Sequence, residues 1–467
     1  MGSYVLIGLG AGVFALLILF IWVGTHELSA GWKWLVRTAV AAVAVVPLTF
    51  AVLWTPLDSP SPTRSADAPS RAERNVAEKS ARPSEPDGRL DEAPAKTPPL
   101  AGPRTETPRS AVRGLTPVPG SPDDRWHVVP VFFGTDRAKD PLRVVIPGYN
   151  AERGKRLELG RALVSIPKQH QVPDIERPWV YKLPFTKLVI YREKEDPQKH
   201  FTLRAVQVVD NTTFIDLIKR RLNTATSFAD HMLVFVHGFN TSFDDALYRT
   251  AQIAYDLKFD GAPLVYSWPS KGEVTSYSYD RESAGQAEPY LKQFLRLATE
   301  ASGAKNVHII AHSMGNQLLL PVLRSLKDSL PQGLKLAQII LAAPDVDRDA
   351  FEFLAAQIKG VSRGVTLYAN ANDRALAASR QFWGGPRAGD VPASGPVIVA
   401  GVDTIDVSAT SSNFLSLNHS GYARNKALLN DIQLILQTGE RPPEKRIPIL
   451  ERITTPRGDY WRYPGAG

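Results

Sequence analysis

The chain of 467 residues contains no cysteine, which excludes disulfides, thiolate metal sites and a cysteine nucleophile and leaves the redox compartment open. It has no dense Lys/Arg block interleaved with aromatic residues, so nucleic-acid binding has little support. The formal net charge of +8 fits a weak attraction to anionic lipid head groups better. We find no phosphate-binding glycine loop, and Asp136, Arg137 and Asp140 lack the spacing of metal ligands. The sequence therefore implies no cofactor and no metal.

Two long apolar runs occur near the N-terminus, at about residues 4–24 and 35–54. Each has about the 20 residues that a helix needs to cross a bilayer. Tryptophans fall near the ends of the runs, where their rings suit the head-group region: Trp22, Trp32, Trp34 and Trp54. The first run lacks a basic flank and a second follows at once, so we favour a transmembrane hairpin in residues 1–56 over a cleaved signal peptide.

Lys33 and Arg37 lie in or beside the short loop between the two runs, whereas the N-terminus has no basic side chain. The positive-inside rule then places this loop in the cytoplasm and the large domain in the periplasm, as a multi-pass protein of the inner (cell) membrane. Arg64, Arg71 and Arg74 beyond the second run argue for the opposite orientation. We keep the periplasmic orientation as the prediction.

Residues 57–124 are rich in Pro, Ser, Ala, Glu and Arg and have few large apolar groups. Such a segment cannot bury enough surface to offset its chain entropy, so we expect a disordered spacer. A catalytic domain at 125–440 and a C-terminal tail at 441–467 follow.

Short apolar strands and amphipathic helices alternate after residue 126. Strands are expected at 127–133, 157–166, 201–209, 232–236, 263–267, 307–311, 337–342, 364–368 and 402–407. Helices are expected at 243–257, 290–301, 317–326 and about 423–436. This pattern indicates an α/β fold with a mostly parallel sheet covered by helices on both faces. In such sheets the chemistry gathers at the carboxyl ends of the strands.

The segment Ala311-His312-Ser313-Met314-Gly315 lies between a predicted buried strand and a predicted helix. This is the setting of a nucleophile elbow, a turn so tight that the residues two before and two after the serine must be small. Ala311 stands where glycine is more usual, but a methyl group still fits. We predict that Ser313 is a nucleophile, the alternative being an elbow without activity.

A serine nucleophile needs a base and an orienting carboxylate, in the chain order Ser, acid, His. His419 is the one histidine after Ser313, and it lies between the last predicted strand and the last predicted helix. Asp373 follows the strand at 364–368, and Asp345 follows the preceding strand. We favour Asp373 because the later position is the commoner one in this arrangement. Asp345 is the alternative acid, or a helix cap.

Two backbone N–H groups are expected to bind the oxyanion, that of Met314 after the nucleophile and that of Phe239 in the glycine turn at 237–240. Five further residues near the same sheet edge are candidates for a substrate pocket: His237, Asn240, Ser267, Trp268 and His312. Packing roles are the alternative for these residues, and His237 fits support of its own loop better than proton transfer.

Several sequence blocks together resemble a bacterial α/β-hydrolase family catalogued as a domain of unknown function, number 900 in its series. The blocks occur in order at 129–137, 237–240, 267–270, 311–315, 341–347, 372–376 and 403–407. The resemblance implies an α/β-hydrolase fold and an esterase or lipase-like activity. It places Ser313, Asp373 and His419 at the triad positions.

The sequence thus predicts a membrane-anchored serine esterase that forms an acyl-enzyme with a carboxylic ester, and lipid esters suit a tethered domain. An acyltransferase with the same triad is one alternative. An inactive scaffold that keeps the hydrolase shape is another. The expected partners are the ester substrate and the bilayer, and the sequence identifies no protein partner.

Overall fold

The computed structural model of this chain describes residues 125–182, 188–327, 329, 336–383, 385–409 and 422–464. All of these residues belong to one of the two units into which the chain divides. Both apolar runs and the spacer lie outside them, so the predicted hairpin is not tested here. Among the described residues, none of the helices is both long enough and apolar enough to cross a bilayer.

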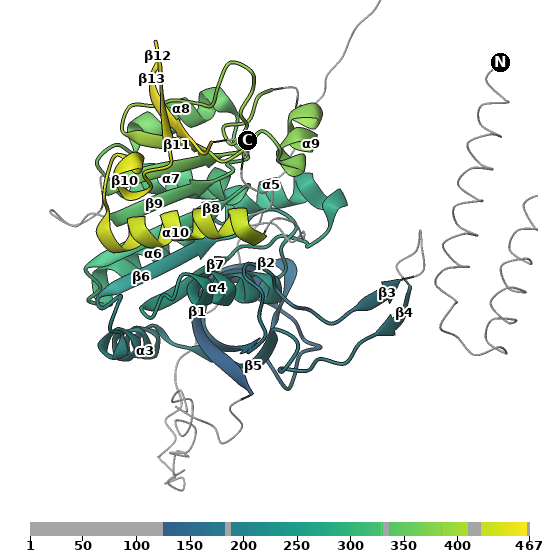
Figure 1. Cartoon of the computed structure of the whole chain (residues 1–467). Coiled ribbons are helices and arrows are strands. Elements are labelled where there is room, and N and C mark those ends of the chain that lie inside the picture. The colour runs from purple at the N-terminus through teal and green to yellow at the C-terminus, as the bar shows by residue number, and fades with distance from the viewer. Residues whose placement is uncertain are drawn as a thin grey trace, which may run out of the picture. The chain divides into compact units, whose positions relative to one another are not determined.

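An 11-stranded sheet forms the centre of the described unit (Figure 1). Its middle strands are β6 (His231–Val236), β7 (Ala262–Ser267), β8 (Asn306–His312), β9 (Leu336–Ala342), β10 (Ser362–Ala369) and β11 (Val402–Asp406), and all pair in parallel. One end is extended by β1 (Trp126–Lys139), β2 (Tyr149–Pro167) and β5 (Thr202–Val209), and the other by β12 (Glu451–Thr455) and β13 (Gly458–Arg462). The order is β12-β13-β11-β10-β9-β8-β6-β7-β1-β2-β5, so the predicted mostly parallel sheet is confirmed.

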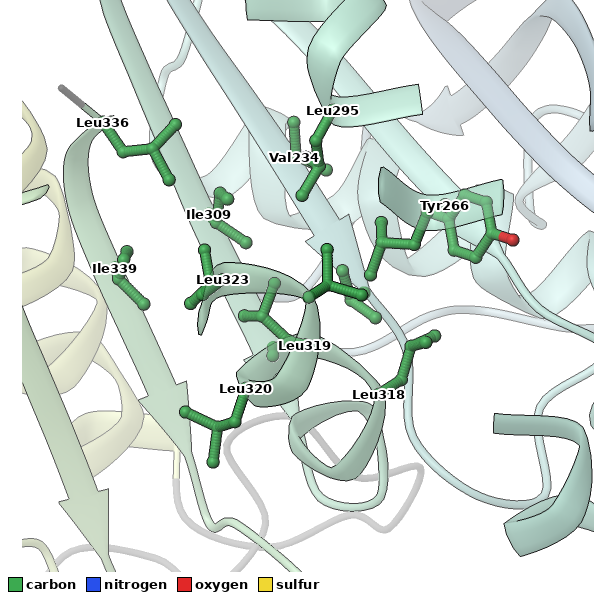
Figure 2. Close-up of a cluster of buried hydrophobic side chains, with 14 of the residues drawn as sticks. Val234, Tyr266, Leu295, Ile309, Leu318, Leu319, Leu320, Leu323, Leu336 and Ile339 are labelled. Atoms are coloured by element: carbon green, nitrogen blue, oxygen red, sulfur yellow. The ribbon is translucent and has the colours of Figure 1, made fainter. Parts of the chain in front are cut away.

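Helices cover both faces of this sheet, because successive residues of a strand point to opposite sides. On β6, Val234 and Val236 pack in one apolar cluster, whereas Leu233 and Phe235 pack in a second. The first cluster includes residues of α3 (Asn211–Thr224), α6 (Glu288–Ala301), α7 (Gly315–Lys327) and α8 (Arg348–Gln357). The second includes residues of α4 (Phe243–Asp256) and α10 (Tyr422–Thr438). Figure 2 shows the first layer, where the leucines of α7 cover Ile309 of β8.

The predicted elements between residues 232 and 436 all occur, with ends within two residues of those expected. β1 and β2 are longer than predicted, because they continue to pair across polar positions such as Thr135 with Glu158. Besides α11, described below, four helices were not predicted: α3, α5 (Tyr277–Gln286), α8 and α9 (Arg374–Trp383). A further hairpin, β3 (Val180–Lys182) with β4 (Val189–Arg192), forms a separate two-stranded sheet.

Residues 441–467, predicted to be a tail, contain the short helix α11 (Pro443–Arg446) and both strands β12 and β13. β13 joins the main sheet by pairing in parallel with β11, and Trp461 lies opposite Ile405. The apolar contacts of Trp461 and Tyr463 bury this segment against the second cluster. The C-terminal segment therefore forms one edge of the main sheet.

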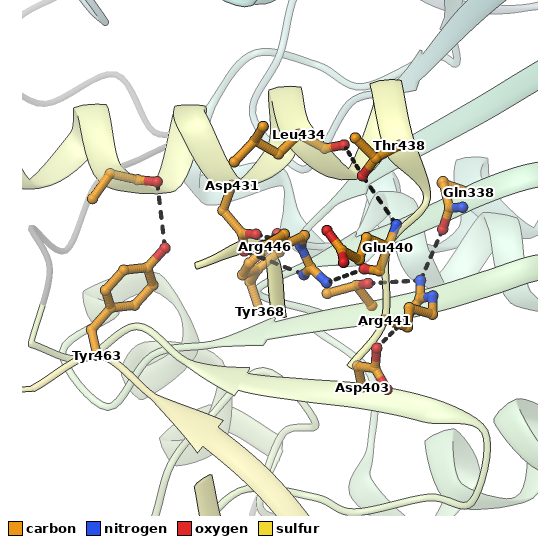
Figure 3. A network of polar contacts seen from close by, with 12 residues as sticks. Gln338, Tyr368, Asp403, Asp431, Leu434, Thr438, Glu440, Arg441, Arg446 and Tyr463 are labelled. Carbon is orange, nitrogen blue, oxygen red and sulfur yellow. Dashed lines mark hydrogen bonds and ion pairs between the residues drawn. The ribbon is translucent and has the colours of Figure 1, made fainter. Parts of the chain in front are cut away.

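A buried polar network fixes α10 to the sheet (Figure 3). Arg446 of α11 donates to Asp431 of α10 at 2.5 Å, and the Tyr368 hydroxyl of β10 donates to the same carboxylate at 2.7 Å. Next to it, Arg441 donates to Gln338 of β9 at 2.9 Å and forms an ion pair with Asp403 of β11. These contacts hold the helix that follows the segment carrying His419.

Candidate active site

Ser313 lies at the turn between β8 and α7, with a backbone φ of +50°. This left-handed conformation is costly for a residue with a side chain and is typical of a nucleophile elbow. A Cβ on Gly315 would lie 2.5 Å from the carbonyl oxygen of His237, so only glycine fits there. The buried Asn316 donates from Nδ2 to the carbonyl oxygen of Ser313 at 3.0 Å, which stabilises the turn. The local geometry therefore matches the predicted elbow.

The glycine turn after β6 passes directly against this elbow. A Cβ on Gly238 would lie 3.0 Å from the Cβ of Ser313, so the turn can approach this closely only as glycine. Among the described residues, the backbone N–H groups of Phe239 and Met314 donate to no protein acceptor. Two unused donors on adjoining segments are what an oxyanion hole requires.

Arg137, at the end of β1, lies buried behind the glycine turn and joins three segments. Its guanidinium donates to Ser267 Oγ at 2.9 Å, to the carbonyl oxygen of Ser270 at 2.9 Å and to that of Thr241 at 2.8 Å. Burial lowers the pKa of Arg137 to about 10, which leaves it charged at neutral pH. Since such a charge needs all its hydrogen bonds satisfied, it fixes the loops after β6 and β7 relative to each other.

Asp280 of α5 completes this support from the other side. Its carboxylate accepts from Ser270 Oγ at 2.5 Å, from Lys271 N at 2.8 Å and from Asn240 N at 3.2 Å. Asn240 has a φ of +58°, so the turn after Phe239 is held in a left-handed conformation by a buried carboxylate. Arg137 and Asp280 thus position the Phe239 N–H without lying at the reacting atoms.

The candidate pocket residues divide into two groups. His237, Ser267 and Trp268 are fully buried, and the His237 ring stacks on Trp268 with centroids 4.8 Å apart. Burial and the charge of Arg137 lower the pKa of His237 to about 3, so it stays neutral and packs behind the loop. Asn240 and His312 are half-buried beside the elbow, and burial lowers the pKa of His312 to about 4.

The two candidate acids have different surroundings. Asp345 is buried and its carboxylate accepts hydrogen bonds from Tyr277 at 2.6 Å, Ser379 at 2.7 Å and Arg387 at 2.8 Å. It caps no helix; Asp347 is the residue that caps α8.

Asp373 is half-buried, and its Oδ1 accepts from the N–H groups of Ala375 and Leu376 at the start of α9. Burial raises the pKa of this carboxyl, and the two N–H groups oppose the shift. Among the described residues, nothing donates to Oδ2 of Asp373, which leaves that oxygen for another donor.

His419 lies outside the described residues, but both flanks of its segment are placed. On the N-terminal flank, Val407 N donates to the carbonyl oxygen of Ala369 at 2.8 Å. Ser408 then accepts from Ala371 N at 2.8 Å and from Asn372 Nδ2 at 2.9 Å. The chain that leads to His419 therefore leaves the sheet beside the loop that carries Asp373, and it returns into the anchored α10.

Sequence reasoning did not find the roles of Arg137, Asp280 and Asn316. For Arg137 a signal was present, because an Asp-Arg pair lies two residues after the apolar run of a strand that proves buried. Its partners lie more than a hundred residues away and two of them are backbone carbonyls, which no motif marks.

Comparison with known proteins now adds the family. Residues 214–438 match the family described as alpha/beta hydrolase of unknown function (DUF900). The resemblance predicted from the sequence is therefore confirmed, although the match begins at residue 214 and leaves out the first predicted block, at 129–137.

Two individual proteins are also similar. The uncharacterized protein alr1448 of Nostoc sp. is 23% identical over 223 residues, which cover 42% of this chain and 50% of that protein. The chain thus spans about half the length of this curated relative. A lipase-esterase related protein from Clostridium acetobutylicum is 11% identical, with a TM-score of 0.23, over 46% of this chain and 94% of that one.

Proposed function

We propose that this protein is a membrane-anchored serine hydrolase that cleaves carboxylic esters, with Ser313 as nucleophile, His419 as base and Asp373 as orienting acid. The observation that carries the proposal is the left-handed Ser313 at a strand–helix elbow, faced by a glycine turn with a free N–H. A left-handed serine costs free energy, and such strain is retained where a hydroxyl must be lifted toward a substrate.

The proposed reaction has two steps. His419 takes the proton of the Ser313 hydroxyl as the oxygen attacks the ester carbonyl, and the N–H groups of Phe239 and Met314 stabilise the oxyanion. Collapse expels the alcohol, which receives the proton from His419 and leaves an acyl-serine. Water, deprotonated by His419, then attacks the acyl-serine, and His419 returns this proton to the Ser313 oxygen as the acid is released. Asp373 keeps the imidazole in the required tautomer.

The choice of Asp373 over Asp345 is supported by their hydrogen bonds. Asp345 is committed to Arg387, Tyr277 and Ser379, so an imidazole would have to displace a buried ion pair. The Oδ2 atom of Asp373 accepts no hydrogen bond among the described residues. The Asp373 loop also adjoins the strand end from which the segment with His419 leaves the sheet. Asp373 is therefore the acid that can reach a histidine at lower cost.

The anchor and its orientation complete the proposal. The runs at 4–24 and 35–54 form the hairpin that tethers the domain at the inner membrane, with the catalytic domain in the periplasm. A tethered esterase meets lipid esters at high local concentration, so lipid esters are the proposed substrate class. Hydrolysis is preferred to acyl transfer because water is the acceptor that needs no further binding site.

The test uses an organophosphonate probe and a panel of chromogenic esters on the full chain. We expect wild type to be labelled and Ser313→Ala to lose both label and ester hydrolysis. Ser325→Ala, an exposed serine on α7, is the matched control and should behave as wild type. A folded wild type without label or turnover would make the protein a scaffold. An ester product formed in place of the acid when an alcohol is added would make it an acyltransferase.

A further inference from the structure

Two segments of the described chain expose large apolar side chains to solvent. The loop between β1 and β2 exposes Val145 at 95%, Leu142 at 88% and Val144 at 83%. Around the β3–β4 hairpin, Trp179 is 61% exposed and Ile190 56%. Single exposed apolar residues are ordinary, but contiguous ones mark a surface that is covered by something. We call these two segments, with Tyr181 and Tyr191 of the hairpin, the apolar rim.

Each part of the rim is tied to α4 by an arginine. In the loop, Arg143 forms an ion pair with Asp244 at 2.6 Å. Before the hairpin, Arg177 lies over the Tyr248 ring, farther along α4, at 4.1 Å, and its charge also acts on the carboxyl of Asp244. Because α4 begins directly after the glycine turn that faces Ser313, the ion pair with Asp244 places the loop part of the rim at the Ser313 edge of the sheet.

The hairpin extends away from the sheet, on the side of the view in Figure 1 where α5 and α9 also lie. Among the described residues, β3 and β4 pair with each other and with no further strand. A lone two-stranded hairpin is marginal in water, and all four residues of β4 are exposed. An apolar phase that covered the hairpin would therefore stabilise it.

The composition of the rim identifies that phase. Trp179, Tyr181 and Tyr191 form one exposed aromatic group, with ring centroids 5.7 and 6.0 Å from Trp179. Tryptophan and tyrosine are the side chains that favour the head-group region of a bilayer. The charged residue of β4, Arg192, is exposed and basic, which suits anionic lipids.

We propose that the apolar rim inserts into the surface of an anionic lipid bilayer and so turns the Ser313 edge toward the membrane. The proposal rests on the proposed function for its consequence, the direct delivery of a lipid ester to Ser313, but the docking itself does not need activity. The apolar runs at 4–24 and 35–54 indicate that a bilayer is within reach of the tethered domain.

The test exploits the absence of cysteine, which allows one label at one introduced thiol. Ile190→Cys carries an environment-sensitive fluorophore in the full chain, reconstituted in vesicles of phosphatidylcholine with phosphatidylglycerol. Phe353→Cys on α8 is the matched control, since Phe353 is 59% exposed and Ile190 56%. We expect lipid-borne nitroxides to quench the label at position 190 about threefold more than at position 353, and less when phosphatidylglycerol is left out.

Equal access of a water-borne quencher to both labels, without quenching from lipid, would overturn the proposal. The label at position 190 could instead be protected from the water-borne quencher in proportion to protein density and not to lipid. That result would overturn the proposal in favour of contact between chains. Ser313→Ala with the label at position 190 should keep the lipid quenching while losing turnover. Docking without turnover in wild type would therefore leave this inference standing and refute the proposed function.

A second measurement links docking to the substrate. Ile190→Asp should lower the rate on an ester dissolved in vesicles about tenfold, because a charge opposes insertion, and leave the rate on a soluble short-chain ester unchanged. An equal loss on both substrates would mean that the hairpin acts on the site and not on the membrane, and it would overturn the proposal.

Discussion

The nucleophile side of the site and its acid side are built in different ways. Behind Ser313, the turn with Phe239 is held by Arg137 and Asp280, both of which are almost fully buried. Across the sheet edge, Asp373 is half-buried and is held mainly by the first N–H groups of its own helix. The candidate oxyanion donors are thus preorganised by long-range contacts, whereas the candidate acid is held by local contacts at the start of its own helix. In the proposed reaction this division would suit charge stabilisation, which needs rigid dipoles.

The largest effect is expected when either of the two candidate acids is replaced by its neutral amide. Asp373→Asn should lower kcat about ten-thousandfold with little change in Tm, because the imidazole loses its required tautomer. Asp345→Asn should instead lower the free energy of unfolding by about 3 kcal/mol, because Arg387 then remains buried without its partner. Ester kinetics and thermal unfolding of both variants check this. The reverse pattern would make Asp345 the acid.

Removing the buried cation tests whether the nucleophile side is held from behind. Arg137→Met should lower the free energy of unfolding by about 3 kcal/mol and also reduce kcat, because the loops carrying Thr241 and Ser270 lose their common donor. Arg324→Met, on the exposed surface of α7, is the matched control. Denaturant unfolding and kcat on one soluble ester measure both effects. If Arg137→Met is destabilised but keeps the wild-type kcat, the glycine turn at 237–240 does not depend on Arg137 for its conformation.

Adding a methyl group at Gly238 tests how closely the glycine turn must approach Ser313. Gly238→Ala should lower kcat about tenfold, because the added Cβ meets the Cβ of Ser313 at 3.0 Å and displaces the Phe239 donor. Gly285→Ala in α5 is the matched control, since nothing lies within 4 Å of its new Cβ. We expect that control to keep full activity and to gain about 0.5 kcal/mol of stability. Equal kcat in the two variants would contradict the oxyanion assignment.

The smallest effect on ester turnover is expected at the C-terminal end of α4. There, His170 lies between Glu176 at 2.9 Å and Asp256 at 3.0 Å. Although burial opposes it, the two carboxylates raise the pKa of His170 to about 9. A raised pKa stabilises the fold fully below the unfolded value of about 6.5, and this contribution is lost as the pH rises through about 9.

Comparison of wild type with His170→Gln measures this contribution. The difference in the free energy of unfolding should be about 2 kcal/mol near pH 6 and should shrink toward pH 10. Ester turnover at a fixed pH should be the same in both proteins, because His170 lies away from the catalytic edge. A difference that stays constant across this range would show that His170 acts through packing alone.

The parallel centre of the sheet could be predicted because its strands are short apolar runs between helices. The helices α5 and α8 could not, since they bury little apolar surface: α8 buries only Phe351 and Ala355, and the buried residues of α5 include Asp280 and Ser283. β12 and β13 carry mostly half-exposed or exposed side chains, so their alternation gives no strong apolar pattern.

The candidate site also has parts that could be predicted from the sequence and parts that could not. The Ser313 elbow and the Asp373 loop could be predicted because local spacing defines them. The support by Arg137 and Asp280 depends on contacts with backbone groups of distant segments, which sequence patterns do not mark. The position of His419 relative to Ser313 stays a prediction.

The pairing of β13 with β11 also bears on when this site can form. β11 is the last strand before the segment with His419, and until residues 458–462 have been synthesised one of its edges has no neighbour. The elbow at Ser313 can fold earlier on a growing chain, since β6, β8 and β9 are already complete. A growing chain could therefore form the Ser313 elbow before the free edge of β11 is covered by β13.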